Sequence, residues 1–293
     1  MLLVEEDDNR KCYFKYNTEP FYEKIKYERD VTMLNKAKTL KNYKLSCIDG
    51  EIGKVKEFYF DDHFWAIRYL IVNTGNWLTG RQVIISPYAL AGVNKEEQSI
   101  TINLTKNQIE NSPSLYNDEP ISRQYEEDYY KYYEWPVYWG GANMWGTNGL
   151  YPCIESSQDQ EKLMGSPQVN EQWENHLHMA SDVIGYDIQA TDGTIGHVDD
   201  FIIDDKTLAI RYLIIDTKNW LPGKKVLISP KWIERISWDE SKVFIALLSE
   251  DIKQSPEYTD EVLLTRDYEN GLYQHYNQQG YWIDEENFNE HLR

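Results

Sequence analysis

The chain contains two copies of one sequence unit, separated by a constant offset. Ile48–Val55 reads IDGEIGKV and Thr191–Val198 reads TDGTIGHV, an offset of 143 residues (191 − 48). The same offset, without an insertion, places Ala66–Ile71 beside Ala209–Ile214, and both segments read AIRYLI. Agreement in register over this length indicates an internal duplication, so we expect the two copies to share one fold.

The duplication continues into an aromatic tail. The residues of the first tail that recur at this offset are Arg123, Tyr125, Glu126, Tyr130, Tyr133, Tyr138 and Trp139, matched by Arg266, Tyr268, Glu269, Tyr273, Tyr276, Tyr281 and Trp282. We therefore expect an N-terminal extension at 1–32, repeat 1 at 33–116, a tyrosine-rich helical tail at 117–139, a linker at 140–175, repeat 2 at 176–259 and a second such tail at 260–293. The glycines of the linker predict flexibility.

Apolar patterning predicts about five short β-strands in each repeat. Phe58 and Phe60 fall on one face of a first strand, and the run Ala66–Val72 is apolar on both faces except at Arg68. Such a run is typical of a central strand, whereas Ile100–Leu104 alternates with the period of a half-buried strand. Closing so few strands would remove exposed edges. We therefore predict a mainly β protein with two tandem small β-barrels, each followed by a short aromatic-rich helix.

Each tail carries an aromatic stripe with helical spacing. The stripe consists of Tyr125, Tyr129 and Tyr133 in the first tail and of Tyr268, Leu272 and Tyr276 in the second. Residues four apart share one helix face, and Ser122 and Thr265 are suitable N-caps. The stripe could pack the helix on a barrel or bind a partner protein, and the sequence leaves both roles open.

The duplicated motifs DGxIGxV, DDxxxAIRYLI, NWLxG and VxISP resemble those of the PRC-barrel family. This family is named for the cytoplasmic domain of the photosynthetic reaction centre H subunit, and a similar barrel forms part of the ribosome maturation factor RimM. The tandem arrangement is similar to that of stand-alone bacterial PRC-barrel proteins. The resemblance implies an adaptor or docking barrel, without catalytic residues to transfer to this chain.

Charge and hydropathy limit the partners. The 30 Lys and Arg residues against 49 Asp and Glu residues give a net charge of −19, which repels phosphate backbones. We therefore expect no direct contact with nucleic acid. No apolar run approaches the roughly 18 residues of a membrane helix, so we expect no integral membrane segment and a cytoplasmic location.

Residues that could carry chemistry do not form a recognisable site. The acidic pairs Asp61-Asp62 and Asp204-Asp205 lack the spacing of a calcium loop and are explained by turns. His176 and His178 have no third ligand nearby, and we interpret them as solvated side chains. Ser86 and Ser229 lack the glycines of a nucleophile elbow. We expect no enzyme, and no catalytic, cofactor-binding or metal-binding residue.

Possible binding residues lie on one strand and one loop of each repeat. Arg68 and Arg211 each interrupt an apolar strand, where a buried guanidinium needs either a local carboxylate or an external anion. The loop residues Trp77 and Leu78, and their equivalents Trp220 and Leu221, could cap the barrel or stay exposed for recognition.

The functional hypothesis is a non-catalytic protein-binding scaffold or adaptor. The alternative is a small-ligand-binding protein, or a factor of the ribosome or of RNA processing by analogy with RimM. We further expect the two repeats to pair within the chain as a pseudo-dimer about a pseudo-two-fold axis. The identity of the partner protein is not predicted.

Overall fold

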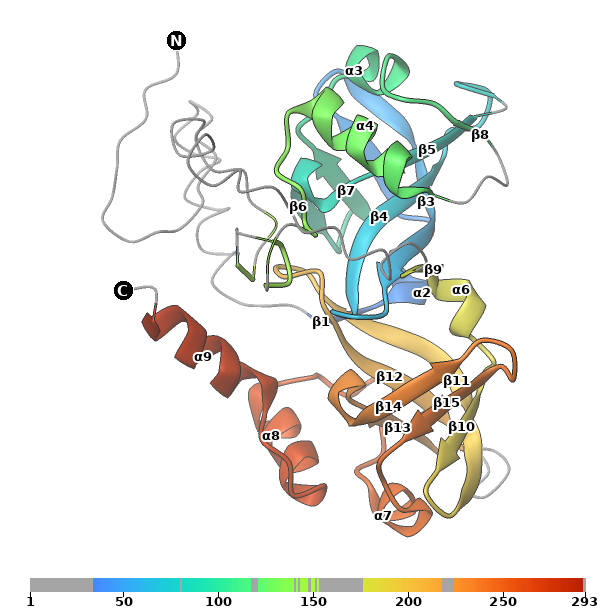
Figure 1. The fold of residues 1–293 in the computed structure, drawn as a ribbon, viewed down its shortest axis with the longest axis vertical. Helices are drawn as coiled ribbons and strands as arrows, with labels where there is room; N and C mark the ends of the chain where they lie inside the picture. The colour runs from blue at the N-terminus through green and yellow to red at the C-terminus, as the bar shows by residue number, and fades with distance from the viewer. Residues whose placement is uncertain are drawn as a thin grey trace.

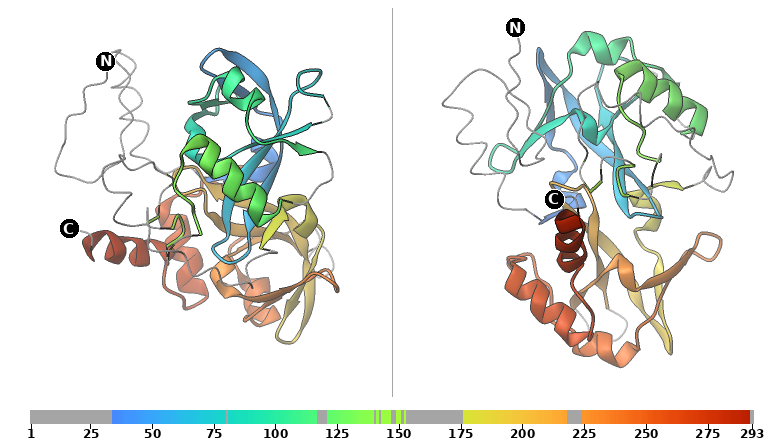
Figure 2. Two further views of the ribbon diagram at one scale, coloured as in Figure 1. Left: turned by 45° about the horizontal axis from the view of Figure 1, so that its top comes forward. Right: turned by 60° about the vertical axis from the view of Figure 1, so that its left-hand side comes forward.

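The computed structural model describes residues 34–79, 81–116, 121–139, 141, 143–146, 149–150, 152, 176–217 and 224–291. Figure 1 shows two β units stacked along the longest axis, each followed by helices, and Figure 2 shows the same arrangement from two other sides. Most of the linker and the N-terminal extension at 1–32 lie outside the described residues.

The two repeats have the same order of elements from the leading strand to the short helix that follows the last long strand. Repeat 1 comprises β1 (Leu34–Lys36), α2 (Ala37–Leu40), β2 (Lys44–Cys47), β3 (Gly50–Asp61), β4 (Ala66–Asn73), β5 (Arg81–Ile85), η1 (Pro87–Ala89), β6 (Leu90–Asn94), β7 (Ser99–Ile102), α3 (Lys106–Glu110) and β8 (Leu115–Tyr116), followed by the tail helix α4 (Arg123–Tyr133). Repeat 2 comprises β9 (Leu177–Met179), α6 (Ala180–Val183), β10 (Asp187–Ala190), β11 (Gly193–Asp204), β12 (Ile210–Asp216), β13 (Lys225–Ile228), η3 (Pro230–Trp232), β14 (Ile233–Ser237), β15 (Lys242–Ile245) and α7 (Ser249–Gln254), followed by α8 (Arg266–His275) and α9 (Tyr281–His291).

The strand orders confirm the duplicated, mainly β fold. Repeat 1 has the order β6-β7-β2-β3-β4-β5-β8, and repeat 2 has β14-β15-β10-β11-β12-β13. In each sheet one pair is parallel, β2 with β7 and β10 with β15, and the other neighbours along these paths are antiparallel. The central strand β4 is buried along its length apart from Asn73, as its apolar run predicts.

The sheets differ from the prediction in one respect, because they are not closed into barrels. Among the described residues, β13 and β14 at the two ends of the repeat 2 path share no ladder. Closure is not needed to cover the long strand β11. Its first half pairs with β10 and its last residues pair with β1 of the other repeat. Strand β1 thus covers the part of the β11 edge that β10 leaves open, whereas β13 and β14 remain the ends of the described path.

The two repeats exchange their leading strands. Leu34 of β1 pairs with Asp204 of β11, and Leu177 of β9 pairs with Asp61 of β3, so the two contacts have the same register. The adjoining backbone hydrogen bonds also join equivalent residues of the two repeats. The N–H of Ile67 donates to the carbonyl of Leu208 at 2.8 Å, and that of Ile210 donates to Trp65 at 2.6 Å. A bridge between Ala66 and Ala209 lies between these bonds.

One hydrophobic core runs through both units. The rings of Phe60 on β3 and Phe201 on β11 lie 6.0 Å apart, and both side chains are fully buried. Ala37 of α2 and Ala180 of α6 belong to the same buried cluster. Apolar burial of this kind, together with the exchanged strands, holds the two repeats together where they meet.

Candidate functional site

The tail helices begin at the predicted caps. Ser122 Oγ accepts the N–H of Tyr125, and Thr265 Oγ1 accepts that of Tyr268. Tyr129 is completely buried and donates from its hydroxyl to the carbonyl of Ile84 on β5, at 3.1 Å. These contacts place α4 on its own sheet (Figure 1).

The remaining stripe residues are also used within the protein. Tyr125 and Tyr268 are half-buried and donate to the carbonyls of Pro113 and Glu257. Tyr133 is half-buried and stacks on Trp135 at 4.4 Å, while Tyr276 is buried beside Trp232. Of the two roles left open by the sequence, these contacts favour packing.

A buried glutamate in each tail organises a network that the aromatic pattern did not reveal. Glu126 Oε1 accepts the hydroxyls of Tyr69, at 2.8 Å, and Tyr138, at 2.6 Å, and its other oxygen lies 2.9 Å from Arg123. Burial raises the pKa of Glu126, and Arg123 opposes that shift. The available signal was a glutamate retained at the 143-residue offset among tyrosines.

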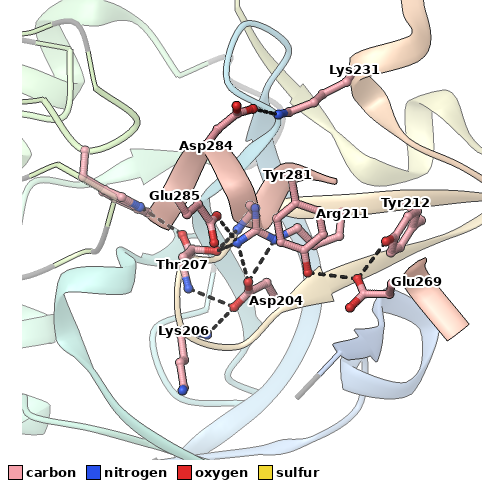
Figure 3. Close-up of polar contacts among 12 residues, drawn as sticks. Asp204, Lys206, Thr207, Arg211, Tyr212, Lys231, Glu269, Tyr281, Asp284 and Glu285 are labelled. Atoms are coloured by element: carbon pink, nitrogen blue, oxygen red, sulfur yellow. Dashed lines mark hydrogen bonds and ion pairs between the residues drawn. The ribbon is translucent and has the colours of Figure 1, made fainter. Parts of the chain in front are cut away.

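The same network surrounds the second glutamate. Glu269 Oε1 accepts the hydroxyls of Tyr212 at 2.7 Å and Tyr281 at 2.9 Å, and Arg266 lies 3.0 Å from the other oxygen. Figure 3 shows Tyr212 and Tyr281 reaching Glu269 from different elements. Each tail is therefore fastened to its central strand by a carboxylate that bridges two tyrosines.

The two strand arginines are buried and contact local carboxylates. Arg68 on β4 binds Asp61 at the end of β3 through its Nε, and Arg211 on β12 binds Asp204 on β11 through Nε, at 2.9 Å, and an Nη, at 2.6 Å. The ring of Tyr138 lies 4.0 Å from the Arg68 guanidinium carbon, and that of Tyr281 lies 3.9 Å from the Arg211 carbon. Each arginine thus links the hairpin to the tail of its own repeat.

The Trp77–Leu78 turn presents a different environment. Both side chains are half-buried against the core, next to exposed Asn76 and Thr79, in the connection between β4 and β5. Their equivalents Trp220 and Leu221 lie outside the described residues. The half-burial of Trp77 is compatible with both predicted roles, capping the sheet and recognising a partner.

The acidic residues of repeat 2 join the repeats. Asp199 lies 2.8 Å from Lys38 Nζ and 2.8 Å from Lys225 Nζ, and buried Asp200 accepts the backbone N–H of Lys38 at 3.2 Å. Within the described part of the chain, no three His, Cys, Asp or Glu side chains gather as metal ligands. The carboxylates are instead used in ion pairs and backbone contacts.

The histidine pair is not solvated as predicted. His176 Nδ1 lies 2.8 Å from Asp62, and His178 Nε2 lies 3.4 Å from the other oxygen of that carboxylate. His178 also stacks on Trp238 at 3.5 Å. Burial alone would raise the pKa of Asp62, but the two imidazoles outweigh it and hold the pKa below its usual value. Pairing of β9 with β3 brings these residues together, and nothing local in the sequence indicates it.

The aspartates of the duplicated DG turns cap helices. Asp192 accepts the backbone N–H and the hydroxyl of Ser249 at the start of α7, both at 2.8 Å. Asp49 accepts the N–H of Lys106 at the start of α3, at 2.9 Å. These bonds lower the pKa of both carboxyl groups, and the hydrogen bond from the backbone N–H has the largest effect.

Asp192→Asn is expected to lower the melting temperature at pH 7 by a few degrees, because the charged cap is lost. The folded pKa lies below the unfolded value of about 3.9, so the carboxylate stabilises the fold above that value and ceases to do so as the pH falls through the folded pKa. In thermal melts from pH 7 to 2, the difference in melting temperature between Asp192→Asn and wild type should therefore shrink below about pH 4 and disappear at lower pH. Asp239→Asn in an exposed turn is the control, and a constant gap for Asp192→Asn would contradict the capping role.

Comparison with known proteins supports the motif-based resemblance. Residues 177–252, which make up most of repeat 2, match the PRC-barrel domain family. The similar sheet of repeat 1 is consistent with two such units in tandem. No curated protein matches the chain. In the described ranges, none of the helices has the length and apolar character needed to cross a membrane.

Proposed function

We propose that this chain, in which residues 177–252 form a PRC-barrel domain, is a non-catalytic scaffold that binds a partner protein through its Trp77–Leu78 turn. The observation that carries the proposal is the contrast between this turn and the other duplicated side chains. The tail tyrosines, the glutamates and the strand arginines contact groups within their own repeat. Trp77 and Leu78 are half-buried against the core in a surface connection, and the Trp77 indole makes no hydrogen bond to the described residues.

The conformation of the turn suits recognition. The N–H of Trp77 donates to the carbonyl of Thr74 at 3.2 Å, and the Thr74 hydroxyl donates to the carbonyl of Trp77. Leu78 adopts a left-handed φ of 53°, and its carbonyl accepts the N–H of Arg81 at 3.3 Å. A fixed backbone reduces the entropy lost on binding, and tryptophan is the side chain most enriched at binding hot spots.

Pairing of the repeats as a pseudo-dimer is part of this proposal. It is supported by the equal registers of β1 on β11 and of β9 on β3. The NWL motif recurs in the sequence at Asn219–Leu221, so the scaffold carries the binding motif twice, and linked motifs gain affinity for one partner. The net charge of −19 favours a protein partner over nucleic acid.

The test is affinity capture with the full chain, comparing wild type with Trp77→Ser/Leu78→Ser. Binding of a true partner should weaken by roughly thirtyfold or more, as expected for loss of a hot-spot tryptophan. Leu263→Ser is the matched control, because Leu263 is an apolar side chain that is 80% exposed and belongs to the tail of the other repeat. The captured partner is then titrated with each variant. Equal affinity for wild type and the double variant would refute the assignment of this turn.

A further inference from the structure

The two buried strand arginines have different sets of partners, although their strands read identically. In repeat 2, one Nη of Arg211 contacts three oxygen atoms, from Asp204, from Thr207 at 3.0 Å and from Glu285 of α9 at 2.6 Å. Figure 3 shows these three side chains converging on the guanidinium. The C-terminal helix thus supplies a second carboxylate to this arginine.

In repeat 1 the corresponding oxygen atoms are missing. Arg68 is completely buried and binds Asp61 through Nε, but within the part of the chain that the structure describes neither of its two Nη atoms has a hydrogen-bond partner. The rings of Tyr138 and Trp145 lie 4.0 and 4.6 Å from its central carbon. Aromatic faces stabilise the positive charge, yet they do not replace the oxygen acceptors that guanidinium N–H groups require.

The sequence explains this difference. At the 143-residue offset, Thr207 corresponds to Phe64 and Glu285 corresponds to Ala142, so both oxygen-bearing side chains are absent from repeat 1. The surrounding charges are otherwise the same, since Arg68, Arg123, Asp61 and Glu126 match Arg211, Arg266, Asp204 and Glu269. Repeat 1 therefore has one carboxylate fewer for the same two arginines.

A small cavity lies next to the side chains that surround Arg68. It has a volume of about 20 Å³, and its lining includes Asp61, Phe64 and Tyr138, which contact Arg68, although Arg68 itself is not one of the lining residues. Arg123 and Glu126 also line it. This space is sufficient for a water molecule or for one oxygen of a carboxylate.

We propose that repeat 1 binds a small free carboxylate anion at Arg68, where it fulfils the role that the Glu285 side chain fulfils at Arg211. Repeat 2 holds three carboxylates against two arginines, so a third carboxylate is compatible with this environment in repeat 1. The site is separate from the Trp77–Leu78 turn, so it does not depend on the proposed protein partner.

The experiment is a titration of the full chain with isotope-labelled formate, observed by NMR, with sodium chloride at equal ionic strength as the reference. We expect one saturable site with a dissociation constant on the order of 1 mM, in line with the limited binding energy of so small a ligand. Arg68→Met should abolish this site. Glu285→Ala should create a second site, because it vacates the position of the Glu285 carboxylate beside Arg211 while the bonds to Asp204 and Thr207 remain, and formate should raise the melting temperature of that variant more than that of wild type.

Several outcomes would overturn the proposal. These are no saturable formate signal above the chloride reference, chloride competing as well as formate, or unchanged binding in Arg68→Met. If Arg68→Met does not fold, the stoichiometry of Glu285→Ala decides, because a second site must appear at Arg211 if formate can take the place of the Glu285 carboxylate. Failure to gain that site would contradict the inference. None of these results affects the test of the Trp77–Leu78 turn.

Discussion

Asp61→Asn is expected to lower the free energy of unfolding by about 3–5 kcal/mol, because it leaves a buried guanidinium without a carboxylate. Arg68 and Asp61 are both almost fully buried, and Asp61 is the sole carboxylate that contacts Arg68 among the described residues. Asparagine preserves the shape of the side chain and can still accept the N–H of Phe64, which now donates to Asp61. The loss of unfolding free energy therefore measures the effect of removing the negative charge and not the effect of a cavity.

Asp204→Asn is the matched comparison in repeat 2. Arg211 would retain Glu285, so this variant should lose only about 1–3 kcal/mol, the cost of one charged hydrogen-bonding partner. Chemical denaturation of both full-length variants, followed by circular dichroism, measures the difference. Equal losses would show that Glu285 does not compensate for Asp204. A double variant with Glu285→Ala should restore the larger loss.

Gly53→Ala should destabilise the protein by about 3 kcal/mol, because the second glycine of the DGxIGxV motif leaves no room for a side chain. A Cβ at Gly53 would lie 2.1 Å from the carbonyl oxygen of Asn73 on the neighbouring strand, and φ is +146°. Gly196 has the same environment in repeat 2, with 2.2 Å to the Asp216 oxygen. Both the backbone conformation and the approach of β3 to β4 require glycine.

The control for this effect is Gly271→Ala. Gly271 lies within α8, and a Cβ there would meet no atom within 4 Å. Alanine should stabilise the helix by about 0.5–1 kcal/mol through the reduced entropy of the unfolded chain. Thermal unfolding of the three proteins distinguishes the cases. A Gly53→Ala protein as stable as wild type would mean that β3 and β4 separate at little cost at this point.

Much of the fold was predictable because it depends on local patterns that occur twice. The continuous apolar run from Ala66 indicated a buried central strand, and β4 is one. Ser122 and Thr265 were recognisable as caps because a cap bonds within one helical turn. The ion pairs of Arg68 and Arg211 with carboxylates were also foreseeable, since an unpaired buried charge is too costly.

Other features depend on segments that meet only in the folded chain. The three-residue strands β1 and β9 carry little signal of their own, and their pairing with β11 and β3 is decided by the edges that the opposite repeat leaves open. Those contacts extend each sheet into the other repeat, and neither sheet closes into the barrel that the sequence favoured.

The different partners of the two arginines are also a tertiary result. Arg68 and Arg211 occupy identical AIRYLI motifs, so their local sequence determines burial and one carboxylate for each. The second carboxylate of Arg211 comes from Glu285, because helix α9 begins at Tyr281, whereas the described residues that follow Tyr138 are not helical. Sequence alone thus determined the duplicated strands and the need for a counter-charge. Which distant groups satisfy that need depended on where the chain returns in space, and this differs between the two repeats.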